Sequence, residues 1–526
     1  MHPERRAVGN TARRRLRASR PALAPPPRGW KRGGPLIHLP REGKAEMARA
    51  TRHSSRQSTR QGTHPVDELL PFPQLALYGF QHVLAFYAAA VIVPVLLGNA
   101  LGLGRQELVH LINADLLTCG IASIVQALGV WKAGARLPLV QGVTFTAVSP
   151  MIAIGLGAGG GTAGLLVVYG AVITAGIATF AFAPLFSRLV KYFPPVVIGT
   201  ILTIIGITLI PVALQDAAGG AHLIGTPAYG SAKNLAYALG TLLFILALVR
   251  VGRPFLSSLA VLLGLVVGTA VAWLFGDVDF GSVAQADWIG VTTPFHFGMP
   301  RFELLPIAAM LVVMLITMVE TTGDVYAIGE ITRKKVDADT VARALRADGV
   351  ATVLGGILNS FPYVAFAENI GIVRMSKVMS RYVVVAAGVF MVVLGLLPKA
   401  GSLVASVPHP VLGGAAVSMF GIVAAVGVQI LAKADLREER NTLILAVSLG
   451  AALLPTTVRP FFERMPDDVR AVLDSGITLG ALSAILLNLL FNVFTSRSTM
   501  EIDWDDVEPD AEEDGPSGPP AWAPAR

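Results

Sequence analysis

Cysteine is almost absent from this sequence of 526 residues, since the single cysteine is Cys119, inside an apolar run. One cysteine cannot supply a disulfide framework or a cysteine-based metal site within the chain. The HExxH pattern of zinc hydrolases and the GxSxG pattern of serine hydrolases are also missing. We therefore predict that the protein is not an enzyme and that it binds neither a metal nor another cofactor.

Charge is scarce as well. Charged residues make up 15% of the sequence and hydrophobic residues 53%, whereas soluble globular proteins have roughly 25% charged residues. Apolar runs recur from Leu75 to Phe494, and no soluble-looking block separates them. The sequence therefore predicts one integral-membrane unit with two tails.

The two tails carry opposite charges. Basic residues dominate 1–66, and aspartate and glutamate dominate 499–526. Both tails are rich in Pro, Ala or Gly and lack apolar periodicity, so we predict that they are disordered and cytoplasmic. The basic tail lacks interleaved aromatic residues and an apolar signal-peptide core. We expect it to attract acidic membrane lipid, and we predict no nucleic-acid partner.

A helix that crosses a bilayer needs about 20 mainly apolar residues. The segments that meet this requirement number about fourteen and lie near 75–98, 107–131, 137–155, 164–187, 194–214, 235–250, 255–275, 304–329, 347–362, 365–380, 382–398, 409–431, 441–456 and 475–494.

The loops between these segments test the count, because loops on the cytoplasmic side are enriched in Lys and Arg. With the basic N-terminus inside, loops after even-numbered spans should be basic, and six of them are, including 333–335. The loop after span thirteen disagrees, since it contains Arg459, Arg464 and Arg470. We predict a multi-pass protein of the cell (inner) membrane with both termini cytoplasmic.

Fourteen spans form two sets of seven, and an odd number inverts the second set relative to the first. We therefore predict an all-α membrane protein with inverted repeats at 67–275 and 276–498. In such transporters, short segments interrupted by Gly and Pro mark the binding site. Spans three and ten have this character: 137–150 reads LPLVQGVTFTAVSP and 359–371 reads NSFPYVAFAENIG. We expect each to hold a short extended stretch followed by a half-helix that lines a cavity.

Span eight places two acids, Glu320 and Asp324, inside an apolar region. They are four residues apart and share one helix face. An acid near the bilayer centre costs roughly 2.5–3.5 kcal/mol on insertion scales, so we favour a functional role. The alternative is a pair near the helix end, or a structural contact between helices.

Span ten adds Glu368 and Asn369 directly after Phe366. Asn369 either caps the following half-helix or contacts a ligand there, and the two roles are compatible. Two carboxylates, an amide, exposed backbone groups and an aromatic ring suit a planar heterocycle with N–H donors and C=O acceptors. An anion such as sulfate would be repelled by Glu320 and Glu368 unless both were protonated.

Further polar residues suit a proton pathway. Gln81 and His82 lie in the middle of span one, Asp348 at the start of span nine and Asp115 in span two. A lone histidine in a membrane is often only a hydrogen bond between helices. Beside Gln81 we favour function, because histidine titrates in the range that a proton carrier uses. For Asp115 the functional and structural interpretations have equal weight.

At these residues the chain resembles the nucleobase–ascorbate transporter family, also called xanthine/uracil permeases, over nearly all of 72–495. The matching runs are the Gln-His pair of span one, LPLVQGVTF of span three, ETTGD of span eight, ADG at 347–349, NSFP at 359–362 and ENIGIVRMSK at 368–377. The last run departs from the family signature at Ser376, where the family has threonine.

The resemblance implies a core domain of spans 1–4 and 8–11 that moves against a gate domain of spans 5–7 and 12–14, commonly in a homodimer. It implies substrate-binding roles for Glu320, Glu368, Phe145, Phe366, Ala367 and Asn369. It implies supporting roles in affinity and proton coupling for Gln81, His82, Asp324 and Asp348.

The substrate signals are mixed. Asp324, with the ADG and NSFP runs, is similar to the xanthine and purine members, whereas Glu368 is similar to the uracil members. We expect proton-coupled import of an oxidised purine such as xanthine or urate, then of uracil, by alternating access. An anion transporter of the same inverted-repeat architecture is the alternative, and a receptor that does not transport is a further one.

Overall fold

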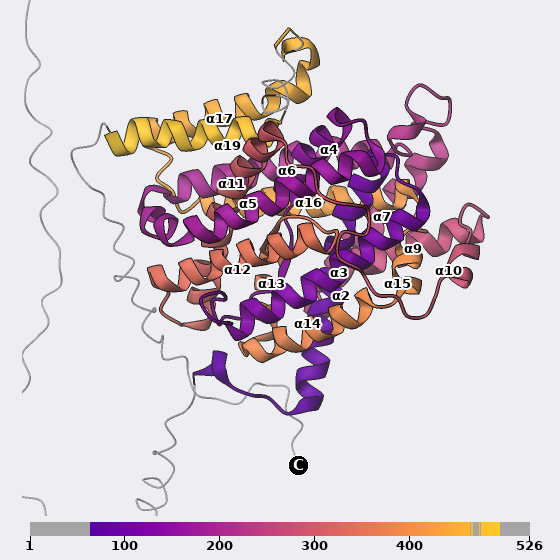
Figure 1. Cartoon of the computed structure of the whole chain (residues 1–526), viewed down its shortest axis with the longest axis horizontal. Coiled ribbons are helices and arrows are strands. Elements are labelled where there is room, and N and C mark those ends of the chain that lie inside the picture. Colours follow the sequence, from indigo (N-terminus) through magenta and orange to yellow (C-terminus); the bar gives the residue numbers. More distant parts are fainter. Residues whose placement is uncertain (1–63, 463, 466–472, 474, 495–526) are drawn as a thin grey trace, which may run out of the picture. The chain divides into compact units, whose positions relative to one another are not determined.

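The computed structural model describes residues 64–462, 464–465, 473 and 475–494. The predicted disorder of the two tails therefore concerns residues that lie almost wholly outside the described part. Helices form most of the described chain (Figure 1). The only strands in the described part are two short ones, β1 (Gln141–Val143) and β2 (Tyr363–Ala365).

The helices up to the middle of the chain are α2 (Phe72–Ala100), α3 (Arg105–Leu128), α4 (Val148–Gly157), α5 (Gly161–Leu189), α6 (Pro195–Ala217), α7 (Ala232–Arg250), α8 (Pro254–Ser258), α9 (Ala260–Leu274) and α10 (Gly281–Gln285). The helices after it are α11 (Leu304–Thr332), α12 (Ala338–Ile357), α13 (Ala367–Ser376), α14 (Arg381–Gly395), α15 (Pro398–Val404), α16 (His409–Leu431), α17 (Glu439–Thr457) and α19 (Gly476–Asn488). Short 3-10 turns include η1 (Pro65–Asp67), η2 (Phe145–Ala147) and η4 (Ala221–Leu223).

Local sequence explains where several helices begin. Proline occupies the first turn of α2, α6 and α16, where no backbone donor is lost from the helix. Side-chain oxygens of Ser231, Asp337 and Ser475 accept hydrogen bonds from the first turns of α7, α12 and α19. Each of these caps satisfies a backbone N–H that has no partner within its helix.

Eight helices of the described chain are long and apolar enough to cross a membrane, and the sharply bent pair α14 and α15 makes a ninth candidate. Each of the fourteen expected segments coincides with a helix or with a strand that leads into a half-helix. The number of complete crossings stays a prediction. Spans three and ten are interrupted as predicted, because β1 and η2 precede α4 and β2 precedes α13.

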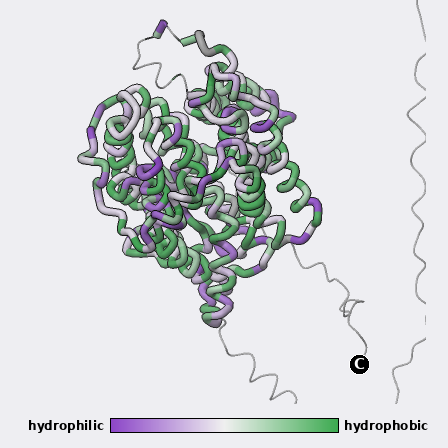
Figure 2. Tube along the Cα trace, turned by 90° about the vertical axis from the view of Figure 1, so that its right-hand side faces the viewer, coloured by the Kyte–Doolittle hydropathy of each residue, from purple (hydrophilic) through white to green (hydrophobic). Residues whose placement is uncertain are grey.

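Large apolar side chains face outward from the helices, as expected for a protein surrounded by lipid. On α7, Leu235, Leu239, Leu243 and Leu246 recur every three or four residues and are at least half exposed. Figure 2 shows hydrophobic residues along the outer helices as well as inside the molecule. An exposed apolar surface of this extent is not typical of a soluble protein, and it fits an integral-membrane chain.

The helix contacts come in pairs that are exchanged when the two halves are exchanged. Helix α3 packs on α14 as α12 packs on α5, and α2 packs on α14 as α11 packs on α5. In the other group α7 packs on α16 as α17 packs on α6, while α6 and α16 pack on each other. A two-fold relation between the halves produces this pattern, which confirms the predicted inverted repeats.

Two groups of helices result from these contacts. Helices α2–α5 pack mainly against α11–α14, whereas α6, α7 and α9 pack mainly with α16, α17 and α19. Helices α17 and α19 lie side by side at one end of the second group (Figure 1). The first group contains the segments of spans 1–4 and 8–11, and the second contains those of spans 5–7 and 12–14; that they form a core and a gate domain stays a prediction. That they move as separate bodies stays a prediction.

Candidate functional site

The two interrupted segments meet as an antiparallel pair of strands. Gln141 lies opposite Ala365, and Val143 lies opposite Tyr363. The N–H of Phe366 donates to the carbonyl of Val140 at 3.0 Å, which extends the pairing by one step. Every residue of both strands is buried. The pairing satisfies backbone groups that would otherwise be unpaired at membrane depth.

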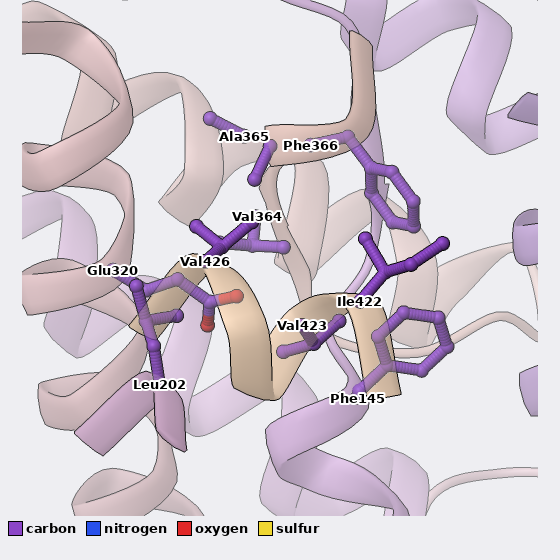
Figure 3. A pocket seen from close by; sticks show the side chains of 10 residues that line it. Phe145, Leu202, Glu320, Val364, Ala365, Phe366, Ile422, Val423 and Val426 are labelled. Carbon is purple, nitrogen blue, oxygen red and sulfur yellow. The ribbon is translucent and has the colours of Figure 1, made fainter. Parts of the chain in front are cut away.

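A small cavity opens beside β2, between the two groups of helices. Its walls are formed by Phe145, Leu202, Glu320, Val364, Ala365, Phe366, Ala367, Ile422, Val423 and Val426. The volume is about 40 Å³, far below the roughly 300–1,000 Å³ of most ligand pockets. Side chains of α6 and α16 cover it (Figure 3), so a bound molecule requires these helices to move away from α11 and β2.

Glu320 supplies the acid of this cavity. Its carboxylate points from α11 into the space, and Phe145 and Phe366 lie on the far side (Figure 3). The hydroxyl of Thr146 donates to Oε2 of Glu320 at 3.3 Å. The acid therefore has a fixed neighbour from the first repeat while it faces the cavity.

Aromatic rings pack against one another along one wall. The ring of Phe366 meets Phe86 edge-on at 4.8 Å between centroids and lies 5.8 Å from Phe145. Phe145 in turn meets Phe420 of α16 at 5.4 Å. Gly142 leaves room for this arrangement, since a β-carbon there would lie 2.4 Å from the Phe366 ring.

Asn369 and His82 form a buried contact behind the half-helix α13. Nδ2 of Asn369 and Nδ1 of His82 are 3.0 Å apart, and both residues are almost completely buried. Gln81 is half-buried next to His82 and makes no hydrogen bond to another described residue of the site. The structure thus joins two of the predicted residues directly and leaves Gln81 apart.

Asp348 is connected by hydrogen bonds to both strands, directly to β1 and through Thr321 to β2. It accepts hydrogen bonds from Nε2 of Gln141 at 2.8 Å and from the hydroxyl of Thr321 at 2.6 Å. The Thr321 oxygen also accepts from the N–H of Ala365 at 3.3 Å. Asp348 is fully buried and does not line the cavity.

The remaining predicted residues have distinct positions. Ala367 is the first residue of α13 and lines the cavity, and Glu368 follows it in the first turn. Asp324 is buried on α11, four residues after Glu320. Asp115 is fully buried on α3 and lies 2.8 Å from the hydroxyl of Tyr363. Asp115 and Asp324 do not line the cavity.

Sequence reasoning missed two kinds of residue. Gln141, Thr146 and Thr321 lie inside motifs that the sequence singled out, so their hydrogen-bonding side chains were a signal that could have found them. The apolar wall from α6 and α16 had no such signal, because Leu202 and Val423 look like any apolar residue of a span.

Among the described residues, no group of three or more His, Cys, Asp or Glu side chains could hold a metal ion.

The sequence matches a known protein family and several of its characterised members. Residues 73–461 match the family model of the xanthine/uracil permeases, described as a permease family. The chain is 44% identical over 418 residues to the nucleobase transporter PlUacP of Paenibacillus larvae, covering 79% of this chain and 94% of the relative. It is 42% identical to the uric acid transporter UacT of Escherichia coli, covering 83% and 90%. It is 40% identical to a xanthine permease of Bacillus subtilis, covering 82% and 96%.

Solved structures share the fold at low identity. The transmembrane domain of a cyanobacterial bicarbonate transporter, BicA, matches with a TM-score of 0.54 and 19% identity, covering 81% of this chain and 100% of that one. The structure of SLC26A9 matches with a TM-score of 0.55 and 12% identity, covering 87% and 73%. At such identities the comparison concerns the fold alone.

Proposed function

Since the chain belongs to the xanthine/uracil permease family and is therefore a multi-pass membrane transporter and not an enzyme, we propose that it imports a nucleobase by proton symport. The favoured substrate is an oxidised purine of the xanthine or urate type, followed by uracil. The observation that carries the proposal is the Glu320 carboxylate, which points into an apolar cavity beside Phe366.

The chemistry of this cavity suits a planar ring. A carboxylate accepts hydrogen bonds from ring N–H groups, and it does so strongly in apolar surroundings. Ala367 begins a half-helix directly after Phe366, and backbone N–H groups at the N-terminus of a helix suit ring carbonyls. We assign Phe366 to the face of the ring, Phe145 and Ala367 to backbone contacts, and Glu368 and Asn369 to the ring edge.

Curated relatives favour a purine. Those at 40–44% identity include a uric acid transporter and a xanthine permease. Uracil is the second candidate because Glu368 is similar to the residue of the uracil-transporting members.

The way in which the cavity is enclosed supports a mechanism of alternating access. One wall belongs to α11, β2 and α13, and the other to α6 and α16. We propose that the group α2–α5 with α11–α14 is the core domain and that the other group is the gate domain. A shift between them enlarges the cavity toward one side of the membrane and then toward the other.

Proton coupling supplies the driving force in this scheme. Protonation of an acid, Asp324 or Glu368, accompanies binding from outside, and the release of both proton and base occurs inside. His82 and Gln81 support affinity, and Asp348 holds the strands. Moving one elementary charge across 100 mV is worth roughly 2.3 kcal/mol, which is enough for an accumulation of tens-fold.

An anion transporter is the second candidate, because BicA shares the fold. The cavity argues against an inorganic anion such as sulfate, which would meet the Glu320 carboxylate in apolar surroundings, where like charges repel strongly, and which lacks the ring N–H donors that a purine offers to a carboxylate. We further propose a homodimer in the cell (inner) membrane, with both termini cytoplasmic and acidic lipid near the basic tail.

The decisive experiment is uptake of radiolabelled xanthine in cells that lack their own purine and uracil carriers. Unlabelled urate, guanine, hypoxanthine, uracil, bicarbonate and sulfate are added as competitors, with and without a protonophore. We expect competition by urate, weaker competition by uracil, none by the inorganic anions, and loss of accumulation with the protonophore. Competition by bicarbonate or sulfate alone would replace the nucleobase proposal with the anion one.

A further inference from the structure

Asp115 forms a buried cluster behind the cavity. It lies ten residues into α3, with no exposed surface. Its Oδ1 accepts hydrogen bonds from the hydroxyl groups of Tyr363 at 2.8 Å and Ser360 at 2.9 Å. Both donors belong to the interrupted segment of the second repeat, so an acid of one half holds the backbone of the other.

The same arrangement occurs with the halves exchanged. Asp348 lies ten residues into α12, which is the counterpart of α3, and is also fully buried. It accepts a hydrogen bond from Gln141, the first residue of β1, as Asp115 accepts one from Tyr363, the first residue of β2. The two aspartates are therefore equivalent positions of the inverted repeat, and each binds the strand of the opposite half.

The two aspartates hold both ends of β2. Asp115 binds Tyr363 directly, while Asp348 acts through Thr321, whose oxygen accepts the N–H of Ala365. The cavity-lining residues Val364, Ala365 and Phe366 follow Tyr363 immediately. The position of the aromatic ring and of the backbone beside it therefore depends on two buried carboxylates.

We propose that Asp115 is a positioning residue of the transport site, which fixes β2 and Phe366 through Tyr363 and Ser360. The inference rests on the proposed nucleobase function and adds a residue that contacts no substrate. Asp115 acts as a hydrogen-bond acceptor here, so its role requires an oxygen at the Oδ1 position and does not require a proton to be carried.

The chemistry of Asp115→Asn separates these two roles. Asparagine keeps a side-chain oxygen that accepts from Tyr363 and Ser360, but it does not titrate. We expect this variant to keep a KM for xanthine within about threefold of the wild-type value, and to keep proton-driven accumulation. Asp115→Ala removes the acceptor and should raise KM roughly ten- to hundredfold, since hydrogen bonds to charged groups are strong. Tyr363→Phe, which removes one donor, should raise KM by less.

Thr118→Val is a matched control on the same helix. Thr118 is equally buried, but its hydroxyl donates to the carbonyl of Ala114 within α3 and not to β2. Its KM should stay at the wild-type value. Surface expression of each variant and hydrogen–deuterium exchange of 363–367 in nanodiscs are measured alongside uptake, and we expect faster exchange there in Asp115→Ala and Tyr363→Phe only.

Two results overturn the proposal. One is an unchanged KM in Asp115→Ala. The other is an Asp115→Asn variant that binds normally but does not accumulate substrate, which would make Asp115 a proton carrier. If Asp115→Ala does not reach the membrane, Tyr363→Phe decides, and unchanged KM and exchange in that variant reject the role. A wild-type protein that carries no nucleobase would reject the proposed function instead, and the exchange of 363–367 would still test the positioning.

Discussion

The hydroxyl of Thr146 lies 3.3 Å from Oε2 of Glu320, although the two residues are 174 positions apart in the chain. Thr146 follows β1 in the first repeat, and Glu320 lies on α11 in the second. The contact crosses from one repeat to the other at the edge of the cavity. The site is therefore shared between the repeats, and substitutions in either one should act on the same step.

Glu320→Gln should impair substrate binding. Glutamine replaces one acceptor oxygen with an N–H₂ group, which meets a ring N–H donor to donor. Hydrogen bonds to charged groups contribute about 1.5–3 kcal/mol, so we expect KM for xanthine to rise about ten- to hundredfold. Initial-rate uptake across a concentration series measures it.

Glu303→Gln is the control for this change, because Glu303 is half-exposed directly before α11, does not line the cavity and pairs with Arg301 at 3.0 Å. It should transport like the wild type. Near-normal concentrative uptake by both Glu320→Gln and Asp324→Asn would refute the assigned site.

Gly142→Ala should displace the aromatic wall. The added β-carbon would lie 2.4 Å from the Phe366 ring and 2.7 Å from Phe86. Overpacking of this kind typically costs 1–3 kcal/mol, so we expect lower thermal stability together with a higher KM. Melting in detergent and uptake kinetics measure the two effects. Gly450→Ala, at a position with open space around it, should show neither, and a wild-type KM in Gly142→Ala would contradict the packing argument.

His82 should tolerate an amide but not an apolar side chain. Nδ1 of His82 pairs with the amide of Asn369 at 3.0 Å, and a glutamine at position 82 keeps a hydrogen-bonding group. His82→Gln should retain most of the affinity, whereas His82→Leu leaves a buried amide unpaired, which costs about 1–3 kcal/mol. Binding of xanthine to purified protein measures the difference. Equal loss in both variants would instead assign an essential proton to the imidazole.

The ion pair between Asp67 and Arg381 should make the stability of the protein depend on pH. Burial raises the pKa of Asp67, but Lys334 and Arg381 outweigh it and hold this pKa below its ordinary value of 3.8. Oδ1 of Asp67 lies 2.7 Å from Nε of Arg381. A carboxyl whose pKa is lower in the folded than in the unfolded protein stabilises the fold at any pH above its unfolded-state pKa. This stabilisation is lost as the pH falls through the folded-state pKa.

Asp67→Asn should therefore be less stable than the wild type near neutral pH, by less than about 1 kcal/mol because the pair is partly exposed. The gap should close as the pH falls below 3.8. Thermal melting across a pH series measures it. Asp287→Asn, at an exposed position, should match the wild type throughout, and a constant gap in Asp67→Asn would contradict the ion-pair explanation.

The sequence predicted the features that depend on local composition. Proline and glycine near Val140 and Phe361 indicated that spans three and ten are interrupted, and they are. Glu320 and Phe366 were predicted to belong to one site, and both line the cavity.

The sequence could not predict contacts that depend on three-dimensional packing. The hydrogen bond from Gln141 to Asp348 joins residues 207 positions apart, and nothing in either segment encodes its partner. The walls from α6 and α16 are apolar side chains in apolar spans, so no periodicity marks them. Their place at the cavity follows from the two-fold packing of α6 on α16.

The pairing of β1 with β2 constrains how the protein is made. The ribosome completes β1 long before β2, so a newly inserted first half carries strand edges without a partner. Unpaired backbone groups in lipid cost several kcal/mol each. The backbone groups of β1 can therefore be paired in this way only after translation of the second half supplies β2.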